Sequence, residues 1–260
     1  MCFTQFTIAQ TDRNVRKHIS LDKKLHISDE FTYIAKYAFL KLGELRIKVY
    51  ARDTVNEKVI YKSVAYIDSY EGLPFVDLHQ TYESWFDSSL RPIYFHARMF
   101  HENDTSYTKY YFKEDNQVHI LKGKSHEQKA SLDTVVYLES SYQDGLSILF
   151  FVRFNTKRNE SLVVPCFVNE DTASTIVNYY SDQHDVSIDA INYDVDCIKI
   201  DGETMFTGIF GLSGYFEGWL TKDEYQVPVA AELEVMIGHI SIELMEWNKY
   251  KWQPPEFRNY

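Results

Sequence analysis

The sequence predicts a mainly β protein: a strongly curled antiparallel sheet, or half-open β-barrel, with one short buried helix. Apolar and polar residues alternate through most of the chain after residue 30, as in Gly43–Arg52, which is the period of a strand with one buried face. Some strands, such as Val59–Asp68, are apolar on both faces, which is typical of a sheet wrapped around a helix or a cavity. Only Gln143–Phe154 repeats its apolar residues at helical spacing.

Composition and charge narrow the class of protein. The 260 residues are 45% hydrophobic, yet their apolar stretches fall short of the ~18 residues that a membrane-spanning helix needs, so we expect no integral membrane protein. Lys and Arg total 27 against 38 Asp and Glu, a net charge of −11 that argues against binding nucleic acid. With no linker or repeat inside the chain, we expect one domain at 31–250, an N-terminal tail at 1–30 and a C-terminal tail at 251–260.

The strands are expected to follow one another along the chain. Phe31–Leu40 and Gly43–Arg52 form the first two, with a tight turn at Leu42–Gly43. Turn-forming residues at Asp87–Ser89 and at Asp115–Asn116 separate later strands. The other strands are expected at 59–68, 75–86, 92–102, 106–113, 117–122, 161–168, 174–181, 186–192, 195–201, 216–220 and 228–247.

The predicted helix is unusual in being apolar nearly all round. Its positions at helical spacing are Leu146, Leu149, Phe150, Arg153 and Phe154, and Ile148, Phe151 and Val152 fill the other sides. A helix of this kind is buried rather than lying on the surface. Asp144 precedes it as an expected N-cap. A buried strand is the alternative, because Phe and Val also favour sheets.

Glycine marks the bends of the second half of the chain. Five of the ten glycines fall between Gly202 and Gly218, where we expect bends or bulges. The final strand is apolar at odd positions up to Ile237 and at even positions from Ile240. A one-residue change of phase predicts a β-bulge at Gly238, with a positive φ there.

Histidines and aspartates show no complete metal-site pattern. His96 and His101 lie five residues apart, on opposite faces of a strand, which disfavours a shared metal. Asp194 and Asp196 share a strand face near Asp201, but the ligand spacing of a calcium loop is absent. We therefore expect no metal site.

Catalytic motifs are equally incomplete. Glu232 and Glu234 share a face at a spacing compatible with glycosidase chemistry, yet neighbours on any wet sheet surface share that spacing. Gly208, Gly211 and Gly214 are spaced by three without opening a helix, so they predict no phosphate-binding loop. We expect a non-enzymatic protein with no catalytic residue and no cofactor, and the sequence assigns no ligand-binding residue.

The cysteines and the N-terminal residues carry information about where in the cell the protein is located. Cys166 and Cys197 are predicted as small core residues outside any CxxC motif, and a disulfide between them is the alternative in an oxidising compartment. Met1–Gln10 is mildly apolar and ends in Ala9–Gln10, like the end of a secretory signal peptide without its basic start. An ordinary frayed start explains these ten residues equally well.

The aromatic side chains need an explanation. They cluster along the expected strands, at Trp85, Phe86, Tyr107, Tyr110, Tyr111, Tyr179, Tyr180, Trp247, Tyr250 and Trp252. Packing within the core and on sheet faces explains them simply, because Tyr and Phe favour strands. The alternative is the wall of a cavity for an amphipathic ligand, in which tyrosine hydroxyls fix the ligand's orientation.

Several segments together resemble a known family. They are Gly43–Leu45, Thr81–Asp87, Leu90–Pro92, Asp144–Ser147 with Arg153, Gly214–Glu224, Val227–Val229 and Val235–Ile240. In this order they resemble a bacterial exported family, domain of unknown function 3108, over roughly Phe31 to Trp247. The resemblance implies an antiparallel half-barrel somewhat like lipoprotein carriers, and export to the periplasm or outer envelope. It carries over no catalytic residue or cofactor.

These observations support a hypothesis and two alternatives. The hypothesis is a non-enzymatic cell-envelope protein that binds a lipid or another apolar ligand within a curled sheet. One alternative is a scaffold component that docks another envelope protein through an exposed sheet edge or aromatic patch. The other is a carbohydrate-binding module, with Trp or Tyr platforms flanked by acidic residues.

Overall fold

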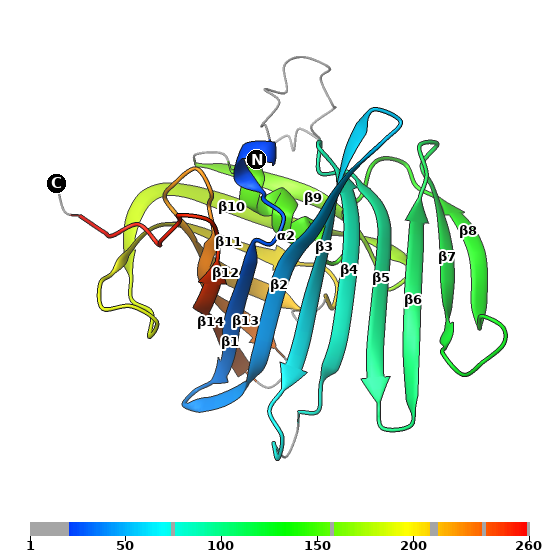
Figure 1. The fold of residues 1–260 in the computed structure, drawn as a ribbon, viewed down its shortest axis with the longest axis horizontal. Coiled ribbons are helices and arrows are strands. Elements are labelled where there is room, and N and C mark those ends of the chain that lie inside the picture. The colour runs from blue at the N-terminus through cyan, green and yellow to red at the C-terminus, as the bar shows by residue number, and fades with distance from the viewer. Residues whose placement is uncertain (1–20, 74–75, 157–158, 209–212, 236–237, 259–260) are drawn as a thin grey trace, which may run out of the picture.

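A computed structural model describes residues 21–73, 76–156, 159–208, 213–235 and 238–258, and these form one 14-stranded antiparallel sheet with a short helix inside its curve (Figure 1). The helices are α1 (Leu21–Lys24) and α2 (Ser147–Phe154). The strands before α2 are β1 (Glu30–Tyr37), β2 (Leu40–Val55), β3 (Lys58–Ser69), β4 (His79–Asp87), β5 (Pro92–His101), β6 (Asp104–Phe112), β7 (Gln117–Lys124) and β8 (Leu132–Tyr137). Those after it are β9 (Glu160–Val168), β10 (Asp171–Val186), β11 (Val195–Thr204), β12 (Gly214–Thr221), β13 (Pro228–Val235) and β14 (Gly238–Asn248).

The sheet consists of two meanders joined at its centre. Its order is β8-β7-β6-β5-β4-β3-β2-β1-β14-β13-β12-β11-β10-β9, so the pairing of β1 with β14 brings the two ends of the chain together. β8 and β9 are the two edges, and the sheet does not close. This confirms the predicted fold class, a mainly β, open and curled antiparallel sheet.

The two halves of the sheet fold toward each other. The ring of Tyr110 on β6 lies 5.1 Å from that of Phe167 on β9, so these distant strands of the sheet order face each other. α2 lies between the halves, with Phe150 packed against Phe86 of β4 at 4.9 Å between ring centroids. On the other side, the Tyr179 hydroxyl of β10 donates to the carbonyl of Val152 at 3.1 Å. The helix is thus enclosed, as its apolar surface predicts.

Asp144 satisfies the amides that open α2. Its Oδ1 accepts hydrogen bonds from the amides of Leu146 and Ser147, at 2.8 and 2.7 Å. The helix itself begins at Ser147, four residues later than the expected segment, and its N-cap is Leu146 rather than the predicted Asp144. The other carboxylate oxygen of Asp144 accepts a hydrogen bond from the hydroxyl of Ser84 on β4 at 2.6 Å, which ties the start of the helix to the sheet. Complete burial raises the pKa of Asp144 to about 6 in spite of these donors.

The first hairpin turns earlier than predicted. The turn lies at Ala38–Phe39, where Ala38 has a φ of 51°, and Gly43 lies inside β2. A Cβ at Gly43 would lie 2.3 Å from the carbonyl oxygen of Asp68 on the neighbouring strand. The glycine therefore serves close strand approach rather than a turn, which is why it misled the placement of the turn.

The segment after β10 is not the predicted strand. β10 is one long strand through Val186, and residues 187–194 leave the sheet. The Asp189 amide in this connection donates to Glu243 of β14 at 2.6 Å, and its carboxylate pairs with Lys36 of β1 at 2.9 Å. The loop is thereby fixed over the junction of β1 and β14. β8 was not predicted from the sequence.

The change of phase at Gly238 marks a hairpin, not a bulge. Val235 pairs with Gly238, so the expected single strand is in fact two antiparallel strands, β13 and β14. Reversal of the chain explains the switch from odd to even apolar positions. Paired residues of antiparallel strands point to the same face, and here odd-numbered residues of β13 pair with even-numbered residues of β14, as Leu233 does with Ile240. The positive φ predicted for Gly238 is confirmed, at +126°. Ile237 and the side chain of Val235, which the prediction also invoked, lie outside the described residues.

Among the residues that the structure describes, none of the helices is long and apolar enough to cross a membrane.

Candidate functional site

The clearest candidate for a binding site is a cavity of about 210 Å³ between α2 and the inner face of the sheet. Its walls come from α2, from β1 and β2, and from β10–β14. Apolar side chains dominate the lining, among them Leu45, Ile148, Leu149, Phe216, Leu233 and Ile242. We call this space the apolar cavity.

Small residues on adjacent strands leave the room. Gly218 on β12 pairs with Ala231 on β13, and both line the cavity. Ile200 of β11 lies opposite Gly218 on its other side, and a Cβ at the glycine would come within 3.2 Å of the Ile200 Cγ1. Two neighbouring inner positions with minimal side chains therefore hollow the wall that faces α2.

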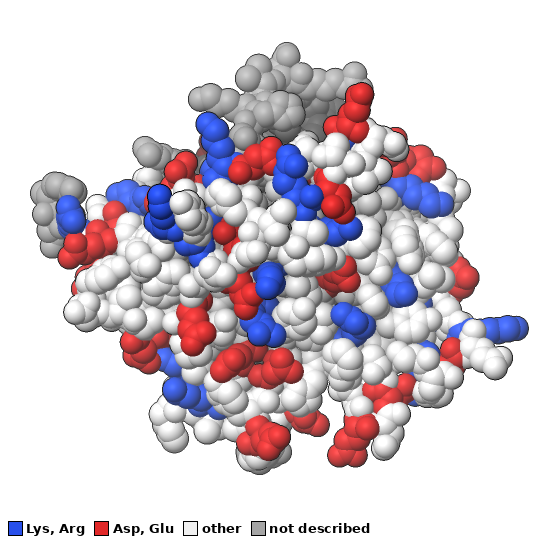
Figure 2. Space-filling view, in the orientation of Figure 1, with Lys and Arg blue, Asp and Glu red and all other residues white. Residues whose placement is uncertain are grey.

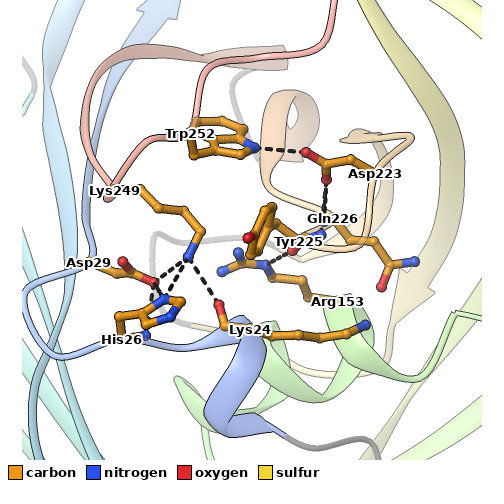
Figure 3. Close-up of polar contacts among 9 residues, drawn as sticks. All are labelled: Lys24, His26, Asp29, Arg153, Asp223, Tyr225, Gln226, Lys249 and Trp252. Carbon is orange, nitrogen blue, oxygen red and sulfur yellow. Dashed lines mark hydrogen bonds and ion pairs between the residues drawn. The ribbon is translucent and has the colours of Figure 1, made fainter.

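Arg153 brings a charge to the lining of this apolar space. It lies in the last turn of α2 and is 5% exposed. Its Nε donates to the carbonyl of Tyr225 at 2.8 Å, but its Nη2 is buried without a hydrogen-bond partner (Figure 3). The guanidinium packs on the rings of Phe31 and Phe154, with Cζ 5.5 and 4.8 Å from the centroids. Burial lowers the pKa of Arg153 to about 10, so the group stays charged at neutral pH.

A buried ion pair beside Arg153 joins the two ends of the chain. The Nζ of Lys249, just after β14, lies 2.7 Å from Oδ2 of Asp29, just before β1, and the two side chains are 1% and 2% exposed. The same ammonium group donates to the carbonyl of Lys24 at 3.1 Å (Figure 3). Leu21 and Leu25 are buried in the main core with Trp252. Segments expected as tails thus contribute side chains to the core beside the cavity.

Asp223 lies in the same region and accepts hydrogen bonds at both of its carboxylate oxygens. The indole nitrogen of Trp252 donates to its Oδ2 at 2.7 Å, and the amides of Tyr225 and Gln226 donate to its Oδ1 at 3.0 and 2.9 Å. The loop between β12 and β13 is thereby fastened to the segment after β14. This loop also supplies the Tyr225 carbonyl that holds Arg153, so Asp223 positions the arginine indirectly.

Three cations lie near one another in this region, and only one of them forms an ion pair within 4.0 Å among the described residues. Burial and the charge of Arg153 both lower the pKa of Lys24 and the pKa of Lys249. Asp29 is committed to Lys249, and no ion pair within 4.0 Å joins Arg153 or Lys24 to a carboxylate of the described residues. We call Lys24, Arg153 and Lys249 the cation cluster.

A second cavity of about 420 Å³ lies between β4–β7 and the end of β9. Gly145 and Gly208 line both cavities, so the two adjoin. The second cavity is more polar: Glu170 accepts from the Tyr110 hydroxyl at 3.2 Å and pairs with Lys122 at 2.7 Å. Its polar groups are thus already joined to one another.

The carboxylates singled out in the sequence do not form one site. Glu232 and Glu234 are exposed on the outer face of β13. Asp201 accepts from Asn178 and Tyr180 at 2.7 and 2.8 Å, which makes it part of an outer-face hydrogen-bond network. Within the described ranges, no group of three or more His, Cys, Asp or Glu side chains is placed to hold a metal ion.

The remaining candidates also lie apart. His96 is partly buried on β5, and burial lowers its pKa to about 4. Gly208 lines both cavities, Gly214 opens β12 with a φ of +88°, and Gly211 lies outside the described residues. Asp194 and Asp196 lie where β11 begins, near the segment at 255–257, which donates and accepts backbone hydrogen bonds there.

The cysteines are core residues, as predicted. Cys166 and Cys197 are free thiols with no exposed surface. Burial raises the pKa of the Cys166 thiol to about 12 and also raises that of Cys197, which leaves both un-ionised at neutral pH.

The aromatic residues divide between core and cavity wall. Phe86, Tyr110, Tyr179 and Trp252 are buried, which supports core packing. Tyr107 and Tyr110 also line the second cavity, whereas Tyr250 is 76% exposed. On the face visible in Figure 2, acidic and basic side chains are interspersed.

Comparison with known families identifies the chain. The sequence model of "Protein of unknown function (DUF3108)" matches residues 32–245. The chain belongs to this family. The resemblance read from the sequence is therefore confirmed, with nearly the same boundaries. No curated protein matches the sequence.

Solved structures share the fold at very low identity. A β-barrel-like protein of domain of unknown function DUF1849 from Brucella abortus matches with a TM-score of 0.56 and 8% identity, over 87% of this chain and 99% of its own. A protein from Bacteroides fragilis, inferred to be exported and with a YmcC-like fold, has a TM-score of 0.37 and 9% identity, over 86% and 97%. A protein from Parabacteroides distasonis, inferred to be a lipoprotein, has a TM-score of 0.35 and 8% identity, over 86% and 96%. The first of these supports the β-barrel-like architecture of the DUF3108 chain.

Sequence reasoning missed the cation cluster as a site. Arg153 was noted only as one position of the helical pattern, although a charge within a helix that is apolar on every side was the available signal. Lys249 and Asp29 gave no signal, because 220 residues separate them and only the β1–β14 pairing brings them together.

Proposed function

We propose that this DUF3108 protein is a non-enzymatic cell-envelope protein that holds the apolar part of a lipid or similar ligand in the apolar cavity. The observation that carries the proposal is the cavity itself, which lies between α2 and seven strands and is lined mainly by apolar side chains. Ligand sites of this kind are concave, mostly apolar and supplied with a few polar groups that fix orientation. The curled sheet provides the concave wall, and the enclosed helix provides the opposite one.

The energetic cost of an empty cavity supports this proposal. Protein interiors normally pack as densely as organic crystals. Covering the apolar walls with a ligand contributes roughly 25 cal/mol for each Å² of apolar surface that it removes from water. Water gains little in a space with apolar walls. A bound apolar group would offset the cost by restoring the lost contacts.

The cell-envelope part of the proposal rests on the resemblance to an exported bacterial family. Met1–Gln10 fits the end of a signal peptide and an ordinary start equally well, so it does not decide the location. Fractionation of the native host cell tests this directly. We expect the protein in the periplasmic or outer-envelope fraction, and recovery in the cytoplasm would contradict export.

Native mass spectrometry tests ligand binding. Protein purified without detergent should carry a bound mass that organic extraction releases and identifies as lipid. The Ala231→Phe variant should lose this mass, because the larger side chain extends into the cavity. Glu232→Phe is the matched control, since it adds the same ring to the exposed outer face one residue away. An empty wild-type protein under these conditions, or equal occupancy of both variants, would contradict the proposal.

A second candidate function, docking of another envelope protein, is favoured by the two open edges. On β8, Val135 and Tyr137 are 42% and 77% exposed, and on β9 Val163 is 61% exposed. Edge strands with exposed apolar side chains offer unpaired backbone groups to a partner strand. Crosslinking in cells followed by affinity purification tests this function. A reproducible partner that Tyr137→Lys abolishes, together with an empty cavity, would favour docking over ligand binding.

A further inference from the structure

No carboxylate of the described residues lies within 4.0 Å of the charge that Arg153 brings to the cavity lining. Arg153 lines the apolar cavity, is 5% exposed, and keeps one of its terminal nitrogens, Nη2, without a hydrogen-bond partner. A buried charge is costly unless it is paired, and a buried donor without an acceptor adds to that cost. The single contact of the guanidinium group with an oxygen acceptor is to the Tyr225 carbonyl, among the residues described.

The surroundings of Arg153 strengthen the attraction for an anion. Lys24 and Lys249 lie close enough that the charge of Arg153 lowers the pKa of each lysine. The neighbouring carboxylates are already engaged, Asp29 by Lys249 and Asp223 by Trp252 and backbone amides. Asp29 and Asp223 offset part of the charge of Arg153 through space, but neither forms an ion pair with it within 4.0 Å.

Tyr33 adds a second polar group at the same place. It lines the cavity on β1, is 4% exposed, and its hydroxyl makes no hydrogen bond within the described part of the chain. Burial raises the pKa of this phenol and the charge of Arg153 lowers it, and both side chains line the apolar cavity. A phenol and a guanidinium group are both hydrogen-bond donors, and together they suit an acceptor that carries a negative charge.

We propose that the apolar cavity binds a single-chain carboxylic acid, a fatty acid in chemical class, with its carboxylate on Arg153 and Tyr33 and its chain along α2. This inference rests on the proposed function and deepens it by naming the class of ligand. The size of the cavity agrees with one chain: engineered cavities of about 150 Å³ hold a benzene molecule, so about 210 Å³ accommodates a modest acyl chain rather than a two-chain lipid.

Isothermal titration calorimetry with two probes tests the inference. Decanoate and decanol share a ten-carbon chain and differ in the head group. After delipidation, the wild-type protein should bind decanoate about 10- to 100-fold more tightly than decanol, the range expected for a hydrogen bond to a charged group. The Arg153→Met variant should lose this preference while it still binds decanol, because methionine keeps an apolar side chain between Phe31 and Phe154.

A matched control and a second variant complete the design. Arg46→Met removes an arginine that also stacks on an aromatic ring, that of Tyr66 at 4.8 Å, but is half exposed on the outer face, so the preference for decanoate should remain. Tyr33→Phe removes only a hydroxyl group and should reduce the preference partially, which keeps the test decisive should Arg153→Met fail to fold.

The outcomes separate the inference from the proposed function. Equal affinity of the wild-type protein for decanoate and decanol would overturn the acidic head group and leave apolar binding intact. A preference for decanoate that survives in Arg153→Met and Tyr33→Phe would overturn the assignment to these residues. Absence of binding by both probes would overturn the proposed function and this inference with it.

Discussion

Lys249→Met tests whether the buried ion pair fastens the two ends of the chain beside the cavity. The Lys249 and Asp29 side chains are 1% and 2% exposed, and their charged atoms lie 2.7 Å apart. After the substitution, Asp29 would still accept a hydrogen bond from the His26 amide at 3.1 Å. It would no longer have the Lys249 ammonium group as its counter-ion. Breaking a buried pair in this way costs about 3–5 kcal/mol. That is a large share of the roughly 5–15 kcal/mol by which a domain is stable.

Urea denaturation followed by tryptophan fluorescence measures this loss. Trp252 is buried in the same region, so its emission should report the transition. The double variant Asp29→Asn with Lys249→Met should recover much of the loss, because no unpaired charge remains. Lys48→Met is the control: its pair with Glu30 at 2.9 Å is partly exposed and should contribute less than about 1 kcal/mol. A Lys249→Met variant no less stable than Lys48→Met would refute the reasoning.

Three further predictions follow from buried or strained positions. Burial raises the pKa of Asp144 from 3.8 to about 6, so its contribution to stability is full below pH 4 and falls by about 3 kcal/mol as the pH rises through 6. The difference in free energy of unfolding between the wild type and Asp144→Asn, measured against pH, should show this slope. A difference that does not change with pH would contradict it. Gly238→Val should cost ~1–3 kcal/mol in thermal or urea unfolding, because φ is +126° and a Cβ would lie 3.3 Å from the Tyr37 ring; wild-type stability would contradict this. Cys166 and Cys197 should resist a thiol reagent in the native state and react together on unfolding, whereas rapid native labelling would show that either is accessible.

The sequence predicted those parts of the fold that local patterns determine. The alternation of apolar and polar residues located most strands, and the segment that is apolar on all sides located α2. Both patterns are local, because which residues are buried depends on the period of the element that carries them. Errors arose where one residue type serves two purposes. Gly43 permits close strand approach rather than a turn, and Gly238 lies at a hairpin rather than a bulge. In both cases the deciding contact is with another strand, which the local sequence does not specify.

The candidate site was less predictable than the fold. The Lys249–Asp29 pair exists only because β1 and β14 lie side by side, a pairing that no local pattern announces. Likewise, the room in the apolar cavity depends on Gly218 meeting Ala231 across two strands, which requires the register. Arg153 was the exception, because a charge on a fully apolar helix is visible in the sequence; only the structure shows that it has no anionic partner within 4.0 Å among the described residues.

A crystal structure with 10-bromodecanoate tests the central claim most directly, because the bromine's anomalous signal marks the end of the chain. The account predicts bromine inside the apolar cavity, between α2 and the strands that carry Phe216 and Leu233, with the carboxylate density at Arg153. Bromine found only on the outer surface, or an apolar cavity closed by repacked side chains of α2, would contradict it.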